Sequence, residues 1–112
     1  MWYIEKKVVI SAGHHLNNYD GACANRHGHN WNIVVFCKGD KLDNLGMLID
    51  FKKIKEAVNY FDHRYLNDLF PEAENPTAEN LARRIYDLIP FKRENINQMN
   101  FDFLQEKLNA KL

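Results

Sequence analysis

Two extended stretches near the N-terminus constrain the fold of this chain most strongly. Residues 2–14 predict a strand, because apolar side chains and a final histidine fall on one parity and therefore on one face. These side chains are Ile4, Val8, Ile10, Ala12 and His14. Residues 27–38 predict a second strand, since β-branched and aromatic types fill its centre, and Gly39-Asp40 then marks a turn. The first strand can pair with the second.

Two helices are predicted to follow the strands. The first runs from about residue 51 to 61, where apolar side chains are spaced for one helical face. The second begins after Thr77, which can cap it, has Glu79 in its first turn and ends at Pro90. Its apolar side chains at helical spacing are Leu81, Ile85, Leu88 and Ile89.

The tail fits a third helical stripe better than an alternating strand. Between residues 96 and 112 the apolar positions that carry this stripe are Phe101, Leu104, Leu108 and Leu112. The order of strand, strand, helix, helix and tail indicates an α+β fold. A length of 112 residues corresponds to one domain, covering residues 1–112.

Composition narrows the classes of partner. Fifteen basic and fifteen acidic residues cancel, which gives no reason to expect nucleic acid or an anionic membrane as a partner. The N-terminus lacks the apolar run of a signal peptide, and no segment approaches the roughly 18 apolar residues of a membrane span. Two cysteines make no disulfide framework. We therefore expect a cytoplasmic protein whose thiols stay reduced.

Three histidines are placed to meet at one end of the strands. His27 and His29 lie two residues apart, so they point to the same face of an extended chain, and Gly28 leaves the opposite face uncrowded. His14 ends the neighbouring strand and can add a third imidazole. Three imidazoles with an open fourth position are the arrangement of catalytic zinc, although imidazole also suits copper, nickel and iron. The alternative is that His27-Gly28-His29 is only a polar surface cluster.

The two cysteines differ in their surroundings. Cys23 lies in a loop rich in small residues just before the second strand, so it can lie near a metal while staying accessible. A nearby cation would lower the pKa of its thiol and make thiolate available. Cys23 could instead ligate the metal and close a structural Cys-His-His-His site. Cys37 lies within an apolar strand and is predicted to be a small buried residue.

Asp62 and His63 form a carboxylate–imidazole pair directly after the first helix. Such a pair can be a base and its orienting group, and a polar pair at a helix end is the alternative. Adjacent side chains seldom bond each other, so we expect the pair to contact a third group.

Five motifs together resemble the 6-pyruvoyl-tetrahydropterin synthase / 6-carboxy-tetrahydropterin synthase family. In chain order they are I-S-A-G-H-H-L (10–16), C-A-N-R-H-G-H (23–29), G-M-L-I-D-F-K (46–52), F-D-H-R-Y-L-N (61–67) and N-P-T-A-E-N-L-A (75–82). The resemblance covers residues 1–90. The three-residue gap between Cys23 and His27 resembles the bacterial 6-carboxy-tetrahydropterin synthases of queuosine biosynthesis.

The resemblance implies a tunnelling fold, an antiparallel sheet with two helices on one face, whose subunits associate into a hexamer. It implies zinc held by His14, His27 and His29, with Cys23 as the proton-abstracting base. It further implies that Asp62 and His63 complete the catalytic relay, and that residues 77–79, with Thr77 and Glu79, lie along a pterin pocket between subunits. His15 occupies a variable position of the motif and is not expected to be a ligand.

The implied reaction converts 7,8-dihydroneopterin triphosphate to 6-carboxy-tetrahydropterin and releases triphosphate and acetaldehyde. Formation of 6-pyruvoyl-tetrahydropterin is the alternative activity. Residues 91–112 depart from the family pattern, which has two closing strands and a pterin-anchoring glutamate. Glu94 and Glu106 are the substitutes that this tail offers. A catalytically silent zinc- or pterin-binding protein is therefore a further alternative.

Overall fold

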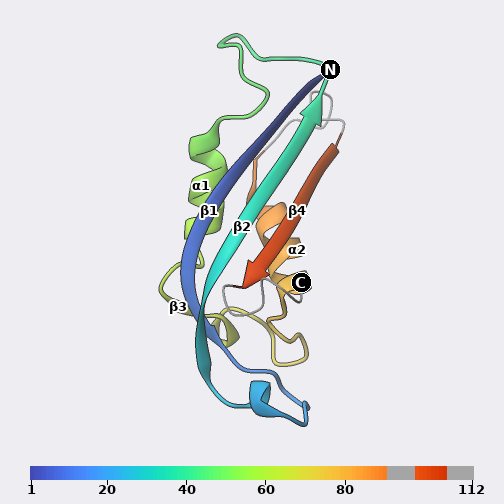
Figure 1. Ribbon diagram of the computed structural model, residues 1–112. Coiled ribbons are helices and arrows are strands. Elements are labelled where there is room, and N and C mark those ends of the chain that lie inside the picture. The colour runs from blue at the N-terminus through green and yellow to red at the C-terminus, as the bar shows by residue number, and fades with distance from the viewer. Residues whose placement is uncertain (91–97, 106–112) are drawn as a thin grey trace.

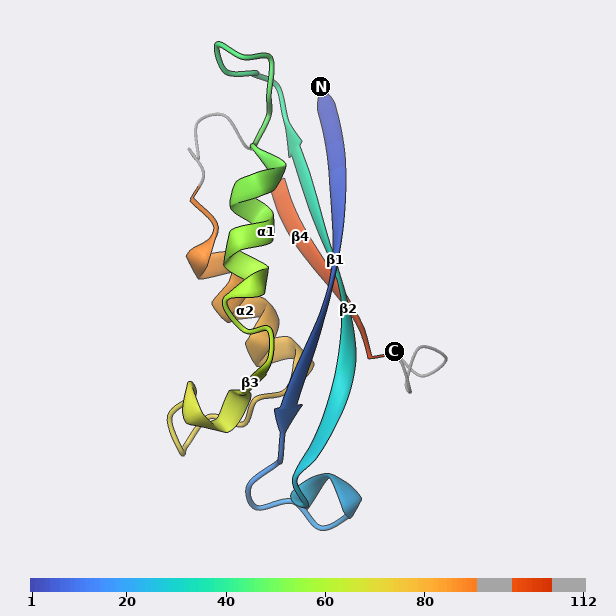
Figure 2. The same ribbon diagram turned by 90° about the vertical axis from the view of Figure 1, so that its left-hand side faces the viewer.

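The fold is a four-stranded sheet covered on one face by two helices. In the computed structural model residues 1–90 are described in full and residues 98–105 as backbone. The strands lie in the order β3-β1-β2-β4 (Figure 1). Both helices lie on the same side of the sheet (Figure 2). The predicted α+β class is confirmed, and none of the described helices is long and apolar enough to cross a membrane.

Strands β1 (Trp2–His14) and β2 (His27–Gly39) form the long central pair of the sheet. They pair antiparallel along their whole length, from Trp2 opposite Gly39 to His14 opposite His27. The first strand was predicted from side-chain parity and the second from its β-branched and aromatic residues, and their observed bounds agree with the prediction to within one residue. The apolar parity of each strand faces the helices.

Helices α1 (Phe51–Asn59) and α2 (Ala78–Leu88) cover that face. The Asp50 carboxylate accepts from Lys52 N–H at the start of α1, and the Thr77 hydroxyl accepts from Asn80 N–H at the start of α2. Helix α1 ends two residues earlier than predicted, at Asn59, and a turn follows it. The start of α2 after Thr77 and its end before Pro90 are confirmed.

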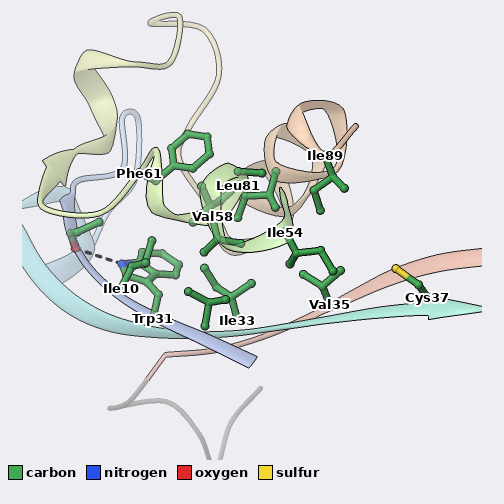
Figure 3. Close-up of a cluster of buried hydrophobic side chains, with 14 of the residues drawn as sticks. Ile10, Trp31, Ile33, Val35, Cys37, Ile54, Val58, Phe61, Leu81 and Ile89 are labelled. Atoms are coloured by element: carbon green, nitrogen blue, oxygen red, sulfur yellow. Dashed lines mark hydrogen bonds between the residues drawn. The ribbon is translucent and has the colours of Figure 1, made fainter. Parts of the chain in front are cut away.

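The core lies between the sheet and the helices (Figure 3). Its fully buried side chains come from both central strands and both helices: Ile10, Trp31, Ile33, Val35, Ile54, Val58, Leu81 and Ile85. Most of the residues predicted to form the inner face of β1 and the apolar faces of the helices are buried, but the predicted position Leu88 is 45% exposed. The core therefore holds the ends of β1 and β2 in a fixed relation to the start of α2.

The predicted tail helix is wrong over residues 98–105. This segment is strand β4 (Gln98–Gln105), antiparallel to β2, with Trp31 opposite Gln105 and Lys38 opposite Gln98. Without β4, the outer edge of β2 would leave a row of backbone N–H and C=O groups without partners in the sheet. Alternation of apolar and polar residues in the segment M-N-F-D-F (99–103) is the local signal for a strand. The predicted positions Leu108 and Leu112 lie outside the described residues.

A short strand, β3 (Arg64–Tyr65), was not predicted. It pairs parallel to β1, with Ala12 opposite Arg64 and Gly13 opposite Tyr65. An added Cβ on Gly13 would lie 3.1 Å from Tyr65 Cδ1 and 3.3 Å from the His27 carbonyl oxygen. Gly13 therefore allows β3 and β2 to approach β1 closely at the end that carries the histidines.

Candidate metal centre

The register of β1 and β2 brings His14, His27 and His29 together at the ends of the strands. His14 lies directly opposite His27, and Ala12 lies opposite His29. One ligand atom of each imidazole lies within 4.8 Å of the others. The ring centroids are 4.5 Å apart for His14 and His27, 5.2 Å for His14 and His29, and 4.6 Å for His27 and His29. The predicted convergence of the three rings is confirmed, and we refer to them as the histidine group.

Backbone carbonyls fix the tautomers of two rings of this group. His14 Nδ1 lies 2.7 Å from the Pro76 carbonyl oxygen, and His27 Nδ1 lies 2.7 Å from the Asn25 carbonyl oxygen. A carbonyl oxygen only accepts, so each Nδ1 must carry the proton and donate it. Each Nε2 then has a lone pair and is ready to bind a metal. This carbonyl contact to the far ring nitrogen is typical of histidine ligands.

The surroundings of the His27 ring are those of a metal ligand rather than those of a polar side chain with all its hydrogen bonds made. Its Nε2 atom is buried and has no hydrogen-bond partner among the residues that the structure describes. Leaving such an atom unpaired costs about 1–3 kcal/mol, so buried polar atoms are normally bonded. A metal bound by the histidine group would supply the missing partner.

Burial favours the neutral form of the His14 imidazole. The side chain is 4% exposed, and desolvation lowers its pKa. The charges that His27 and His15 would carry when protonated lower this pKa further, while the hydrogen bond to Pro76 partly offsets the shift. The neutral form is the one that binds metals. Three imidazole nitrogen ligands match zinc, copper, nickel and iron in type.

Trp31 forms the floor of the histidine group, a role that the sequence did not reveal. The buried indole lies edge-on to His14, with ring centroids 5.1 Å apart, and to His29 at 5.7 Å. Its Nε1–H donates to the Ala12 carbonyl at 3.1 Å (Figure 3). Because Trp31 follows His29 at the same parity, it connects the histidine group to the hydrophobic core.

Cys23 lies beside the strand ends but outside the histidine group. It belongs to a short 3-10 turn, Ala22–Ala24, and its carbonyl accepts from Leu16 N–H at 2.8 Å. The side chain is half-buried and free of disulfide bonding. Among the described residues, the only side chains whose ligand atoms converge are the three histidines, which favours an open site over a closed Cys-His-His-His site.

Cys37 has the buried environment expected of it. Its side chain is fully buried between β2 and the helices, and burial raises the pKa of its thiol to about 11. A thiol of this kind is unreactive near neutral pH.

Asp62 and His63 lie at the edge of β1, near the histidine group. Asp62 Oδ1 accepts from Ser11 N–H at 2.8 Å, which is the third group that the sequence predicted. Contrary to expectation, the two neighbouring side chains also contact each other, with His63 Nδ1 3.0 Å from Asp62 Oδ2. The reason is the left-handed backbone of His63, at φ 56°, which turns its ring back toward the carboxylate.

The surroundings of this pair keep the carboxylate charged. The hydrogen bond from Ser11 N–H lowers the pKa of Asp62, and the His63 ring adds to this effect. The His63 side chain is 81% exposed. Within the described part of the chain, no hydrogen bond joins Asp62 or His63 to the Cys23 thiol.

A cavity of about 520 Å³ opens beside the Asp62–His63 pair. Its lining includes Ser11, Gly28 and Asn30, whose parity directs them to the sheet face opposite the helices. An added Cβ on Gly28 would meet nothing within 4 Å, as expected for a glycine that leaves this face uncrowded. His63 and Tyr65 border the cavity from the edge of the sheet.

Among the described residues, the remaining predicted site residues contribute no ligand atom to the histidine group. Thr77 caps α2 through its hydroxyl, and Glu79 is an exposed residue in the first turn of that helix. His15 hydrogen bonds with the Tyr65 hydroxyl through Nδ1 and with the Asn17 side chain through Nε2. Glu94 and Glu106 lie outside the described residues.

Comparison with known proteins agrees with this architecture. The sheet with two helices on one face and a histidine group at its strand ends defines a tunnelling-fold protein with a potential metal site. A family model described as 6-pyruvoyl tetrahydropterin synthase matches residues 3–111. The chain belongs to the 6-pyruvoyl tetrahydropterin synthase family.

Several curated relatives carry the name of the carboxy enzyme. The chain is 35% identical over 95 residues to the 6-carboxy-5,6,7,8-tetrahydropterin synthase of Synechocystis sp., covering 77% of this chain and 73% of that protein. It is also 35% identical over 91 residues to the protein of that name from Bacillus subtilis, covering 75% of this chain and 62% of the relative.

Solved structures show the same fold at lower identity. The 6-pyruvoyl tetrahydropterin synthase of Caenorhabditis elegans superimposes with a TM-score of 0.66 at 22% identity, covering 93% of this chain and 94% of the other. The Plasmodium vivax enzyme of that name gives 0.53 at 16% identity, covering 94% and 99%.

Proposed function

We propose that this protein is a zinc-dependent enzyme that converts 7,8-dihydroneopterin triphosphate to 6-carboxy-5,6,7,8-tetrahydropterin in queuosine biosynthesis. The reaction consumes one water and releases triphosphate and acetaldehyde. The observation that carries the proposal is the histidine group, in which His14 and His27 already hold their Nδ1 protons away from the site. The relatives at 35% identity that are named for this product support the choice of reaction.

In this proposal His14, His27 and His29 hold the metal. Zinc bound there would act as a Lewis acid toward side-chain oxygens of the substrate. The half-buried position of Cys23 beside the strand ends supports its role as the base that removes a proton from the substrate side chain. Because a thiolate is needed for this step, the enzyme would work in a reducing cytoplasm.

Asp62 and His63 are proposed to transfer protons during the same reaction. The 3.0 Å contact to Asp62 Oδ2 sets the orientation of the His63 ring, and it favours the tautomer that carries its proton on Nδ1. Nε2 of His63 is then the atom that accepts a proton, and imidazole is the side chain that most often serves as a general acid or base. The exposure of His63 beside the cavity supports access by a substrate.

Thr77 and Glu79 are proposed to line the pterin pocket, and residues 1–112 to form one domain of a hexamer. In the pocket between subunits that the family implies, these two residues would approach substrate held by a second chain. The exposed position of Glu79 at the start of α2 is compatible with this role. A monomeric mass in light scattering at micromolar concentration would contradict the hexamer.

Formation of 6-pyruvoyl-tetrahydropterin is the second candidate activity. The description of the matching family model and the names of the superimposed structures favour it. Both activities would use the same substrate and the same metal, so the product alone distinguishes them. The carboxy activity releases acetaldehyde, whereas the pyruvoyl activity keeps the three-carbon side chain.

The test is turnover by purified protein of measured zinc content. Incubation with 7,8-dihydroneopterin triphosphate, followed by mass spectrometry of the pterin and an assay for acetaldehyde, should give the carboxy product. A pterin that keeps its three-carbon side chain would select the second activity. Zinc-loaded, folded protein that releases neither product would contradict both and leave the catalytically silent alternative.

A further inference from the structure

The orientation of His14 depends on a carbonyl group that lies far away in the sequence. The Pro76 oxygen accepts from His14 Nδ1–H at 2.7 Å and is 62 residues away along the chain. Pro76 is fully buried, and the peptide group that carries this carbonyl has its N–H on Thr77. The groups that hold this peptide therefore fix the direction of the carbonyl.

The residue before the proline supplies those contacts. The Asn75 carbonyl accepts from Thr77 N–H at 2.8 Å, which closes a tight turn centred on Pro76. The same carbonyl accepts from the Asn80 side-chain amide at 2.8 Å. The peptide on each side of Pro76 is therefore fixed relative to the start of α2.

The Asn75 side chain connects this turn to the segment that follows His14. Its Oδ1 accepts from Asn17 N–H at 2.7 Å, and its Nδ2–H donates to the Asn17 carbonyl at 3.0 Å. The primary amide thus satisfies both backbone groups of one residue, as a neighbouring strand would. Asn17 lies only three residues after His14, and Asn75 directly precedes Pro76. The amide pair between Asn75 and Asn17 therefore also limits the distance between the Pro76 carbonyl and the His14 ring.

We propose that Asn75 is a positioning residue for His14: its amide pair with Asn17 holds the Pro76 carbonyl against Nδ1–H and so directs Nε2 into the metal site. The inference rests on the proposed metal site, to which Asn75 contributes no ligand atom. Outer-shell partners of a histidine ligand typically change metal affinity by about 10–100-fold when they are removed. Removing the Asn75 amide should have an effect of that size.

Asn67 provides a matched control. Its side chain makes the same kind of pair with His15, accepting from the backbone N–H at 2.9 Å and donating to the carbonyl at 3.1 Å. It therefore also ties down the segment after His14, but within the described residues its hydrogen bonds go to His15 and none goes to the turn at Pro76. Comparing Asn75→Ala with Asn67→Ala separates the orientation of the carbonyl from general support of this segment.

The first measurement uses metal-free protein and does not depend on the proposed function. Long-range ¹H–¹⁵N correlation spectra, at a pH where the imidazoles are neutral, report which ring nitrogen of each histidine is protonated. Wild type and Asn67→Ala should show His14 as the Nδ1–H tautomer. Asn75→Ala should show a mixture of the two His14 tautomers. A single Nδ1–H tautomer in Asn75→Ala would overturn the proposal.

The second measurement is zinc affinity by competition with a chromophoric chelator. Asn75→Ala should bind zinc about 10–100-fold more weakly than wild type, and Asn67→Ala should bind it as wild type does. Equal losses in both variants would mean that Asn75 has only a general structural role, which would also overturn the proposal. Should Asn75→Ala fail to fold, Asn75→Asp tests the same point, because it can accept from Asn17 N–H but cannot donate to the Asn17 carbonyl.

The two measurements distinguish failure of this inference from failure of the proposed function. A wild-type protein that binds no zinc would contradict the metal site, yet the His14 tautomer would still report the effect of Asn75. Zinc binding with an unchanged tautomer in Asn75→Ala would leave the metal site intact and remove only the role of Asn75.

Discussion

Replacing His27 by alanine should not destabilise the metal-free protein by much, but it should remove most of the stability that zinc adds. In the metal-free protein the substitution removes a hydrogen bond from Nδ1 to the Asn25 carbonyl, with a net value of about 0.5–1.5 kcal/mol. It also removes the buried Nε2, whose missing partner costs about 1–3 kcal/mol. The two changes oppose each other. On these two contributions we expect the metal-free variant to lie between about 0.5 kcal/mol less stable and about 2.5 kcal/mol more stable than wild type.

The metal-bound protein should respond much more strongly. Structural zinc sites with four ligands bind with apparent free energies of about 10–16 kcal/mol, so each ligand is worth roughly 3–4 kcal/mol. The loss of one of three ligands should therefore weaken binding by about 100–1,000-fold. At free zinc 100 times the wild-type Kd, wild type gains about 2.7 kcal/mol of stability from the metal. The variant, with zinc at or below its own Kd, should gain at most about 0.4 kcal/mol.

Denaturant unfolding of dialysed protein, with and without buffered zinc, measures both quantities. His15→Ala is the control, because His15 lies next to a proposed ligand but bonds with Tyr65 and Asn17 instead. It should lower the stability of the metal-free protein and keep the full gain from zinc. A His27→Ala variant that keeps the full gain would refute the assignment of the ligands. A wild-type protein that gains nothing would refute the site itself.

Three further outcomes follow from the positions of the other groups. Cys23→Ala should abolish turnover and keep zinc, whereas Cys37→Ala should keep turnover and lower stability by about 1 kcal/mol, as measured by kinetics, metal analysis and unfolding. Asp62→Asn should lower turnover with little change in zinc content. Because the pKa of Asp62 is lowered in the folded protein, wild type should lose stability as acid protonates this carboxylate, and the variant should lack that part of the loss. The lowered pKa of His14 has a related effect on metal-free protein: stability should fall as pH drops below about 6.5, since protons then bind the unfolded chain preferentially, and His14→Gln should reduce the fall.

Local patterns in the sequence were sufficient to predict the parts of the fold that depend on neighbouring residues. Parity along residues 2–14 predicted the first central strand, and the β-branched and aromatic residues of 27–38 predicted the second. The capping signal at Thr77 predicted the start of α2. The histidine group followed from parity alone once the two strands were assumed to pair. Its convergence needs only that His14 ends one strand and that His27 begins the next.

Features that depend on distant contacts could not be predicted in this way. Strand β3 and the hydrogen bond from Ser11 to Asp62 require that the turn after α1 returns to the edge of β1, which no local pattern encodes. The contact between Asp62 and His63 requires a left-handed backbone at a histidine, which spacing does not indicate. Strand β4 was missed because helical spacing of apolar residues and strand alternation coexist in that segment. The strand forms because it pairs with the outer edge of β2, a contact that the local pattern does not reveal.

The proposed catalytic groups differ in how rigidly the fold holds them. His14 and Ser11 belong to the same strand, three residues apart, and their opposite parities direct them to opposite faces of the sheet. Ser11 holds Asp62 through its N–H, so the distance from the metal ligands to the Asp62–His63 pair is set by one paired strand. Cys23 lies instead on a short turn, held at its carbonyl by Leu16 N–H. Since a strand paired on both sides moves less than a loop turn, substrate binding should adjust the position of the Cys23 thiol toward a metal site and an acid–base pair whose spacing stays fixed.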